Sequence, residues 1–193
     1  MYVCHTRSGG SRPNHPPPPL LTCTYPLLSH CIYSDDLLSL IKHNINAHHL
    51  YRMAVEDWIR SGYPFHILRD HVNHCIVMNG GMWGGVKGGL GVEGGMQKLV
   101  EDWDARNEYM ADLHFLEERV WPIVKHKQIA HDSYCCDRYP HTRPYPTKRY
   151  MDYQHVGQVF DELDRPRLTD IDGFIRGVPV PSSCRKQSDW IYG

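Results

Sequence analysis

The chain has 193 residues, enough for one domain with a sizeable core and hardly enough for two. Its 21 Lys and Arg nearly balance its 22 Asp and Glu, so no long-range field marks a nucleic-acid or membrane-surface binder. No run of about 18 apolar residues occurs, and we expect no membrane span. The first residues also lack the charged-then-apolar pattern of a secretory signal, so the default expectation is a cytoplasmic protein.

The chain is unusual in its 14 His and in its odd count of 7 Cys. The cysteines show no paired C-x-x-C spacing, which argues against a zinc ribbon and leaves the disulfide pairing open. Cys135 and Cys136 are adjacent, and we expect them not to bridge each other because that geometry is strained. A His-rich metal-binding protein is therefore one hypothesis for function.

The sequence divides into a leader and a domain. Residues 1–45 contain four consecutive prolines, a Gly-Gly pair and scattered serines, and they predict a leader that is disordered or not native to the domain. Within it, two aspartates that can cap a helix precede a short apolar run, which predicts a helix at 35–42. We expect an α/β domain over residues 46–193.

The first elements that we expect in the domain are a helix and two strands. Apolar residues four apart predict a helix at 48–60, which Ser61 and Gly62 end. Short apolar runs then predict strands at 63–68 and at 75–78. Nine glycines fall between Gly80 and Gly95, so we expect no regular structure there.

The second half predicts mostly helix and loop. We expect helices at 96–103 and at 106–120, the second being the best supported, with Pro122 ending or kinking it. A proline-rich loop covers 140–146, and a short helix is expected at 156–163. Strands and helices alternate, and this pattern favours an α/β fold.

A first candidate site follows the strand predicted at 63–68. Arg69, Asp70, His71 and His74 fall within six residues there, and His66 lies close by in sequence. Ligands of α/β proteins bind beyond the carboxyl ends of strands, and an Arg side chain binds phosphate or carboxylate with its fork of donors. The alternative is an Arg–Asp pair that closes the strand, with histidines at the surface.

A second candidate site is the glycine-rich segment that follows. Gly80, Gly81 and Gly84 let a backbone approach a ligand closely, and Trp83 offers a flat apolar face for a sugar ring or a base. Neither a P-loop nor a G-x-G-x-x-G spacing occurs. The alternative is a glycine loop whose Trp packs into the core.

Three weaker signals follow in the second half. His131 and Asp132 are neighbours, and an imidazole with a carboxylate can bind a divalent metal. Lys148 and Arg149 form a basic pair after prolines that can meet a diphosphate, although such pairs are usually solvated. Asp112 lies on the best helix, where periodicity gives no reason to single it out.

Taken in order, several segments between residues 51 and 193 resemble a family of nucleotide-sugar glycosyltransferase-like proteins with the A-type fold. The segments are AVEDWIRSGYPFHILRDHVNH, IVMNGGMWGGVKGG, YMADLHFLEERVWPIV, HDSYCC, RPYPTKR, HVGQVFDE and CRKQSDWIYG. Each motif is modest alone, and their shared order and spacing carry the resemblance.

The resemblance implies a partial Rossmann-like open sheet with flanking helices that binds a nucleotide-diphosphate sugar, with Mn²⁺ or Mg²⁺ and a glycan acceptor. It implies that Asp112 lies near the transferred sugar as the catalytic carboxylate, and that His131 or Asp132 contacts the metal or the diphosphate. It places an acceptor side near the GGMWG segment. The residues implied to bind substrate are Arg69, Asp70, His71, His74, Gly80, Gly81, Trp83, Gly84, Lys148 and Arg149.

The chain departs from the family pattern in two places. The family's Asp-x-Asp-Ser-Arg element precedes the helix of residues 48–60, where this chain reads HNINAHHLYR. The glutamine that follows the acidic residue of the family's Asp-Gln pair is Leu113 here. The sequence therefore predicts a transferase-like domain without a full donor site, truncated or inactive, or alternatively a non-catalytic carbohydrate-binding or interaction domain.

Overall fold

The structure is a computed structural model that describes residues 2–4, 45–104, 109–149, 153–163 and 165–191. The helix expected at 35–42 lies outside the described residues, as does most of the expected leader. The described part of that leader is the strand β1, Tyr2–Cys4, which pairs with the domain's sheet.

A five-stranded mixed sheet forms the centre of the domain, in the order β1-β3-β2-β4-β5. The strands β2, β4 and β5 are parallel to one another, while β3 runs antiparallel to β2 and parallel to β1. Their bounds are Phe65–Arg69 for β2, Trp83–Val86 for β3, Gln128–Asp132 for β4 and Thr142–Pro144 for β5. The expected α/β class is confirmed at this level.

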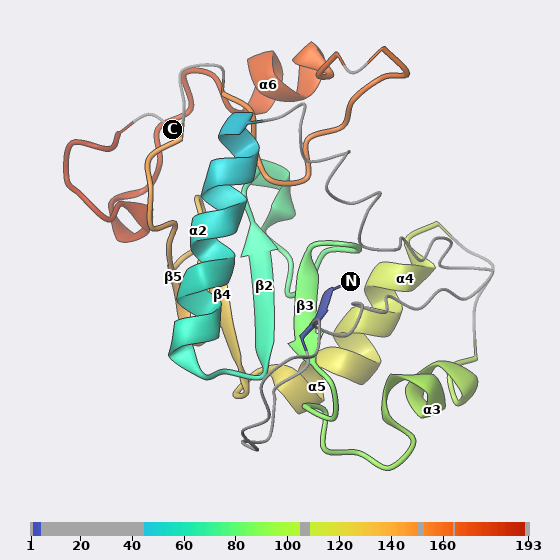
Figure 1. Cartoon of the computed structure of the whole chain (residues 1–193). Helices are drawn as coiled ribbons and strands as arrows, with labels where there is room; N and C mark the ends of the chain where they lie inside the picture. The colour runs from blue at the N-terminus through green and yellow to red at the C-terminus, as the bar shows by residue number, and fades with distance from the viewer. Residues whose placement is uncertain (1, 5–44, 105–108, 150–152, 164, 192–193) are drawn as a thin grey trace, which may run out of the picture.

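Helices cover both faces of the sheet (Figure 1). The helix α2, Ile45–Ser61, lies across one face. The other face packs against α4, Ala111–Phe115, the π-helical turn η2, Leu116–Val120, and α5, Trp121–Val124. The remaining helices are α3, Gly95–Glu101; α6, Leu168–Phe174; and the 3₁₀ turns η1, Val72–His74, and η3, Ser182–Cys184.

The helix α2 confirms the helix expected at 48–60. Ala54 and Trp58 are buried against the sheet one turn apart, as the apolar spacing requires. Ser61 donates its hydroxyl to the carbonyl of Trp58 at 2.6 Å, and the indole of Trp58 donates to the carbonyl of Tyr63 at 2.7 Å. Gly62 then takes φ +74°, the left-handed conformation that ends many helices.

The strand β2 confirms the strand expected at 63–68, and all five of its residues are buried. Successive side chains of a strand point to opposite faces. Ile67 packs in the core that faces α4 and α5, whereas Leu68 belongs to the cluster on the α2 side. Because both faces are covered, the strand buries His66 and Arg69 as well.

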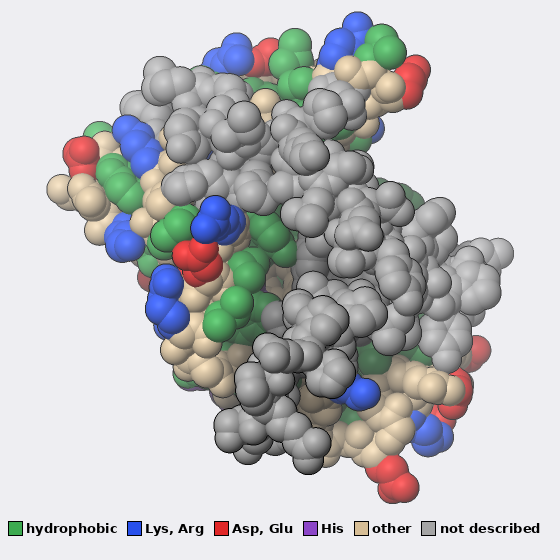
Figure 2. Space-filling model, viewed as in Figure 1, with side chains coloured by type: hydrophobic (Ala, Val, Ile, Leu, Met, Phe, Trp, Pro, Cys, Tyr) green, Lys and Arg blue, Asp and Glu red, His purple; other side chains and the backbone are tan. Residues whose placement is uncertain are grey.

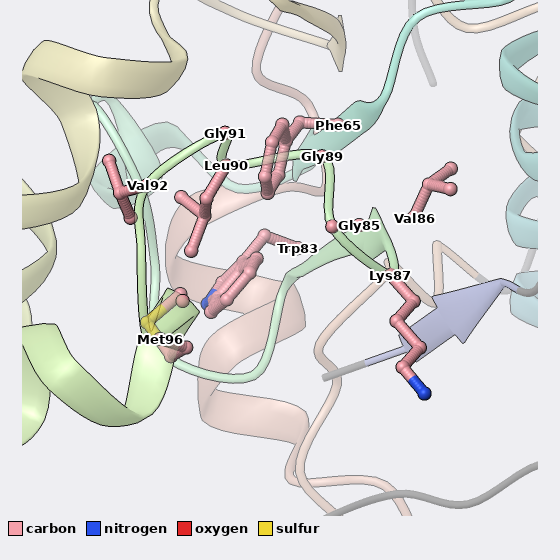
Figure 3. A pocket seen from close by; sticks show the side chains of 12 residues that line it. Phe65, Trp83, Gly85, Val86, Lys87, Gly89, Leu90, Gly91, Val92 and Met96 are labelled. Carbon is pink, nitrogen blue, oxygen red and sulfur yellow. The ribbon is translucent and has the colours of Figure 1, made fainter.

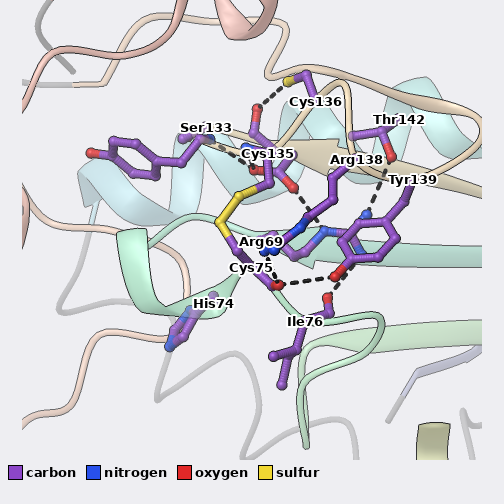
Figure 4. Close-up of polar contacts among 12 residues, drawn as sticks. Arg69, His74, Cys75, Ile76, Ser133, Cys135, Cys136, Arg138, Tyr139 and Thr142 are labelled. Carbon is purple, nitrogen blue, oxygen red and sulfur yellow. Dashed lines mark hydrogen bonds and ion pairs between the residues drawn. A yellow bond between two sulfur atoms is a disulfide. The ribbon is translucent and has the colours of Figure 1, made fainter.

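The strand expected at 75–78 is wrong, because side chains take up its backbone carbonyls. Arg69 donates to the carbonyl of Val77 at 2.8 Å, and Tyr139 donates its hydroxyl to the carbonyl of Cys75 at 2.9 Å. Figure 4 shows these contacts around the Arg69 guanidinium. With these acceptors used, the segment follows an irregular path between η1 and β3.

The expectation of no regular structure in the glycine-rich segment is also wrong, since β3 lies within it. Gly84 and Gly85 pair with His66 and Phe65 of the antiparallel neighbour β2. A Cβ built on Gly85 would lie 2.7 Å from Cε1 of Phe65. The glycines therefore make room for the cross-strand ring, and the Phe65 side chain restores the packing that a glycine lacks.

The helix expected at 106–120 is confirmed in its second half and extends further than expected. Described helix begins at Ala111, widens into the π turn η2, and continues through Pro122 to Val124. Pro122 stands at the start of α5, where its missing N–H is tolerated. Tyr109, which lies within the expected helix, is 91% exposed.

Two further differences lie after residue 124. The helix expected at 156–163 is wrong: Gly157 has φ +89°, and Val156 donates its backbone N–H to Asp70 rather than to a helix. The strand β4 was not expected from the sequence, because it mixes Gln128 and His131 with apolar residues. Both of its faces are buried, so it has no alternating polar and apolar pattern. Within the described residues, no helix has the length and apolar character needed to cross a bilayer.

Two disulfides join the segments beyond the carboxyl end of β4. Cys135 bridges to Cys75, and Cys136 bridges to Cys184. The adjacent cysteines thus pair with different partners, as expected. Together they fasten the irregular segment before β3 and the C-terminal segment to the same turn.

Candidate functional site

An open hollow of about 500 Å³ gathers residues from three of the motifs singled out in the sequence. His74 comes from the end of η1, Gly80 and Gly81 from the turn before β3, and Asp112 from the first turn of α4. These segments are up to 38 residues apart in sequence (74 to 112), yet they line one concave surface. We refer to this surface as the open hollow; its other lining residues are Asn79, Met82, Tyr109, Met110, Leu113 and Gly157.

Asp112 lies directly over the backbone of Gly80. A Cβ built on Gly80 would meet Oδ2 of Asp112 at 2.6 Å, well inside normal contact. Any other residue at this position displaces the carboxylate or the turn. Gly80 therefore allows a close approach to its backbone, as the sequence suggested. In this structure the approaching group is the carboxylate of Asp112 rather than a ligand.

The glycines occupy a turn whose geometry needs them. Met82 donates its N–H to the carbonyl of Asn79 at 3.2 Å, which closes a turn with Gly80 and Gly81 in the middle. Gly81 has φ +72°, a left-handed conformation that a turn accepts from glycine at little cost. Asn79 is buried and donates its side-chain amide to the carbonyl of His74 at 3.3 Å.

The lining of the open hollow also includes an exposed aromatic residue. Tyr109 is 91% exposed and precedes Met110, a non-glycine residue at φ +68°. Such a backbone costs on the order of 1–3 kcal/mol and tends to occur where function requires it. The helix expected at 106–120 includes Tyr109, which in the structure precedes the N-cap of α4 and faces solvent.

The ring of His74 belongs to a group of aromatic rings in tilted contact. The His71 ring lies 4.9 Å from that of His74, 5.0 Å from that of His155 and 5.2 Å from that of Phe174, centroid to centroid. His71 also accepts a hydrogen bond from the backbone of Asn73 at 3.1 Å. The structure thus brings His74 to the open hollow and places His71 as packing behind it.

Arg69 is buried in an ion pair and does not reach the open hollow. Its Nε donates to Oδ2 of Asp132 at 2.7 Å, its Nη2 donates to Thr142 at 3.2 Å, and its plane lies 4.6 Å from the ring of Tyr139. The carbonyl of Val77 accepts a further hydrogen bond from the guanidinium at 2.8 Å. Figure 4 shows the guanidinium between Tyr139 and Thr142. Arg69 therefore serves the protein itself, as the alternative expected, but its partner is Asp132 rather than Asp70, and His66 and His71 are buried rather than at the surface.

Asp70 is likewise committed to the protein. It is fully buried and forms an ion pair with Arg149, accepts from the hydroxyl of Ser133, and accepts from the backbone of Val156 at 2.8 Å. Arg149, expected at the surface, is only 6% exposed. The pair joins the end of β2 to a segment 79 residues later in the chain.

His131 lies on the α2 side of the sheet, in a buried chain of polar groups. Asp57 accepts from Nε2 of His131 at 3.1 Å, so Nδ1 of His131 accepts from Nε2 of His66 at 2.8 Å. Burial lowers the pKa of His131 from 6.5 to about 4, although Asp57 opposes the shift. Burial also lowers the pKa of His66 well below 6.5, with His131 adding to the effect. Both rings are neutral at pH 7.

The predicted metal pair of His131 and Asp132 does not fit a metal ion. Both nitrogens of His131 are hydrogen-bonded, and the oxygens of Asp132 accept from Arg69 and from two backbone amides at 2.8 Å each. As strand neighbours the two side chains also point to opposite faces. Asp132 does lie near Cys136 and Cys184, but those sulfurs bridge each other.

Trp83 lines a different cavity from the one expected. It is 7% exposed and belongs to the core, where it borders an apolar pocket of about 180 Å³ between β3 and α3. Figure 3 shows the indole of Trp83 among Phe65, Leu90 and Met96, with Lys87 directed away. Trp83 therefore packs in the core, as the alternative interpretation expected, and does not form an exposed platform for a sugar. Gly84 is buried next to Trp83 in β3.

On the part of the face that Figure 2 colours, Lys and Arg side chains lie among Asp and Glu side chains, without a large patch of one sign. Lys148 is exposed at the mouth of a small crevice that Arg149 and Asp70 also line. Of the residues expected to bind substrate, His74, Gly80 and Gly81 thus line the open hollow, and the basic pair lies elsewhere. No family model, curated protein or solved structure matches the chain.

Proposed function

We propose that the chain is a glycosyltransferase-like protein that binds a sugar in the open hollow, with Asp112 as the carboxylate nearest the bound ring. The observation that supports this is the convergence of His74, the Gly80–Gly81 turn and Asp112 on one concave surface. A volume of about 500 Å³ suits one or two sugar rings, since ligand sites of this kind span roughly 300–1,000 Å³.

The groups around the open hollow match what sugar recognition needs. Sugar rings stack on aromatic faces and present hydroxyls that bind carboxylates and amides. Tyr109 supplies an exposed ring, Asp112 a carboxylate, and the Gly80–Gly81 turn a bare backbone that a ring can approach closely.

In a transfer reaction, Asp112 can act as a general base or as a stabilising anion. As a base it removes the proton from an acceptor hydroxyl while that oxygen attacks the anomeric carbon, and the bond from this carbon to the diphosphate oxygen breaks to release the nucleoside diphosphate. As an anion it stabilises the positive charge that develops on the sugar ring in the transition state. The donor in this proposal is a nucleotide-diphosphate sugar, and the acceptor is a glycan.

The metal that the resemblance implies finds no fitting ligands in His131 and Asp132, whose polar atoms serve the protein itself. This misfit favours a second candidate: a domain that binds carbohydrate in the same hollow without catalysing transfer. Both candidates require the open hollow to bind a sugar, and they differ in whether a nucleotide sugar binds and reacts.

Calorimetry on the full chain tests the proposal. A panel of nucleotide sugars with Mn²⁺, the same panel with Mg²⁺, and free mono- and oligosaccharides are titrated separately. Asp112→Asn and Tyr109→Ala are measured beside Asp102→Asn, an exposed carboxylate at the end of α3.

Saturable heat with a nucleotide sugar, together with product formation that Asp112→Asn lowers at least tenfold, supports the transferase. Heat with free sugars alone, weakened by Tyr109→Ala and not by Asp102→Asn, supports the non-catalytic domain. If no sugar binds, or if the hollow variants bind as well as the parent chain, the proposal is wrong.

A further inference from the structure

A small crevice lies at the carboxyl edge of the three parallel strands. Asp70 follows β2, Ser133 follows β4 and Tyr145 follows β5, and all three line the crevice. These strands are neighbours in the sheet, so the residues that follow them meet at one edge. Ligands of α/β proteins bind at this edge.

Three polar groups in this crevice are buried without a hydrogen-bond partner among the described residues. They are the hydroxyl of Tyr145, the hydroxyl of Thr147 and the Nε of Arg149. Leaving one such group unpaired in the interior costs on the order of 1–3 kcal/mol, and native proteins rarely gather several in one place. The crevice therefore requires an occupant that supplies hydrogen-bond partners.

The hydrogen-bonding groups of the crevice indicate which class of ligand it can bind. Asp70 is its carboxylate, and its oxygens already accept from Arg149, Ser133 and Val156. Burial raises the pKa of Tyr145 well above 10, with Asp70 adding to the shift, so its hydroxyl stays a donor at neutral pH. The Nε of Arg149 can only donate.

Charge points the same way. Arg149 and Asp70 neutralise each other, whereas the exposed ammonium of Lys148 at the mouth has no ion-pair partner among the described residues. A set of donors with one net positive charge favours an acceptor-rich anion over a neutral ligand.

We propose that this crevice binds one oxyanion group, a phosphate or a carboxylate, with two of its oxygens inside. The internal space of about 30 Å³ holds about two oxygen-sized groups, since one water needs roughly 10–15 Å³. The hydroxyls of Tyr145 and Thr147 and the Nε of Arg149 donate to these oxygens, and Lys148 neutralises the charge from outside. This site is separate from the open hollow and does not depend on the sugar proposal.

Titration of the full chain with inorganic phosphate and with glucuronate, at ionic strength held constant with sodium chloride, distinguishes the two sources of the oxyanion. Glucose serves as the neutral control for glucuronate. Tighter binding of phosphate assigns a phosphate ligand, and tighter binding of glucuronate assigns a carboxylate; either result supports the site.

Tyr145→Phe and Thr147→Val remove single hydroxyls that have no partner within the described protein. Both variants should therefore melt no lower than the parent chain, because each removes a buried polar group that lacks a partner. Each should weaken oxyanion binding about tenfold, the usual effect of losing a hydrogen bond to a charged group. Lys148→Gln should weaken it as well, whereas Lys125→Gln, at an exposed lysine elsewhere, should not.

The proposal is overturned if neither anion binds saturably in the millimolar range, which would mean that ordered water fills the crevice. It is also overturned if anions bind but Tyr145→Phe, Thr147→Val and Lys148→Gln leave the affinity unchanged. Because the two hydroxyl variants are expected to fold normally, a lower affinity cannot be ascribed to unfolding once their melting temperatures are measured.

Discussion

The carboxylate of Asp112 and the backbone of Gly80 are in such close contact that a Cβ on residue 80 would lie 2.6 Å from Oδ2. The contact joins the first turn of α4 to the turn before β3, and so fixes where the hollow's carboxylate stands. Through this contact, the glycine-rich turn and the first turn of α4 line the same hollow.

We predict that Gly80→Ala lowers the sugar affinity of the open hollow at least fivefold while leaving most of the fold intact. The added methyl pushes the Asp112 carboxylate away from its position, since Oδ2 is the nearest atom to the new Cβ. Calorimetry with whichever sugar binds the parent chain measures the effect.

Gly173→Ala is the matched control, because nothing lies within 4 Å of a Cβ there and the residue is inside the helix α6. This variant should bind sugar normally and should be slightly more stable, as Ala replaces Gly in a helix. Equal affinity of Gly80→Ala and Gly173→Ala would contradict the role given to the contact.

The helix α2 and the strand β2 were predictable because each obeys one simple pattern. Ala54 and Trp58 mark a helical face, and Gly62 ends it in the left-handed conformation. The strands β3 and β4 were not predictable in this way. The glycines of β3 give no strand pattern, and their packing comes from the ring of Phe65 on the neighbouring strand. Both faces of β4 are buried, so polar residues such as His131 interrupt the apolar pattern that predicts a strand.

The candidate site was predictable in its parts and not in its assembly. His74, Gly80 and Asp112 were singled out separately, yet only the tertiary packing of η1, the turn and α4 puts them on one surface. Trp83 shows the opposite case: a lone Trp among glycines looks like a binding platform, but the indole packs into the core. A sequence pattern does not tell which side of a strand will be covered.

We predict that the domain loses stability as the pH falls from about 6.5 toward 4. The pKa of His131 is about 4 in the folded chain and near 6.5 when the chain is unfolded. Between these values the unfolded state binds more protons, so the free energy of unfolding falls as the pH is lowered. Above the window both states are neutral and the effect is absent.

The difference between the folded and unfolded pKa of His131 corresponds to roughly 3 kcal/mol, and the lowered pKa of His66 adds a loss of the same sign. Urea unfolding at pH 7, 6 and 5 measures the slope before most carboxylates titrate. His131→Gln should flatten the slope, although it lowers stability at pH 7. A free energy of unfolding that stays constant between pH 7 and 5 would contradict the neutral, buried pair.

We predict that Arg69→Met destabilises the domain by about 3–5 kcal/mol, since it leaves the charge of Asp132 buried without its partner. Asp132→Asn should cost less than Arg69→Met, because an amide oxygen can still accept from the backbone of Tyr134 and Cys135. Denaturant unfolding of both variants gives the two values.

Lys98→Gln is the control for the buried ion pair. Lys98 and Asp102 also form an ion pair, at 2.6 Å, but their side chains are 57% and 42% exposed. Water screens such a pair, so its loss should change stability by less than about 0.5 kcal/mol. Similar losses in Arg69→Met and Lys98→Gln would show that the Arg69 guanidinium is not buried as described.

Finally, we predict that the native chain contains the Cys75–Cys135 and Cys136–Cys184 bridges and that reduction destabilises it. The bridges close loops of 60 and 48 residues, and chain entropy alone gives each about 4 kcal/mol. Peptide mapping without reductant should recover both pairs, and a Cys136→Ser, Cys184→Ser variant should unfold at lower denaturant. Because disulfides persist in oxidising compartments, expression there should raise the yield of folded protein over cytoplasmic expression, against the default expectation from the N-terminal residues. A vicinal bridge between Cys135 and Cys136, or four free thiols in the folded protein, would contradict the pairing that joins these segments to the end of β4.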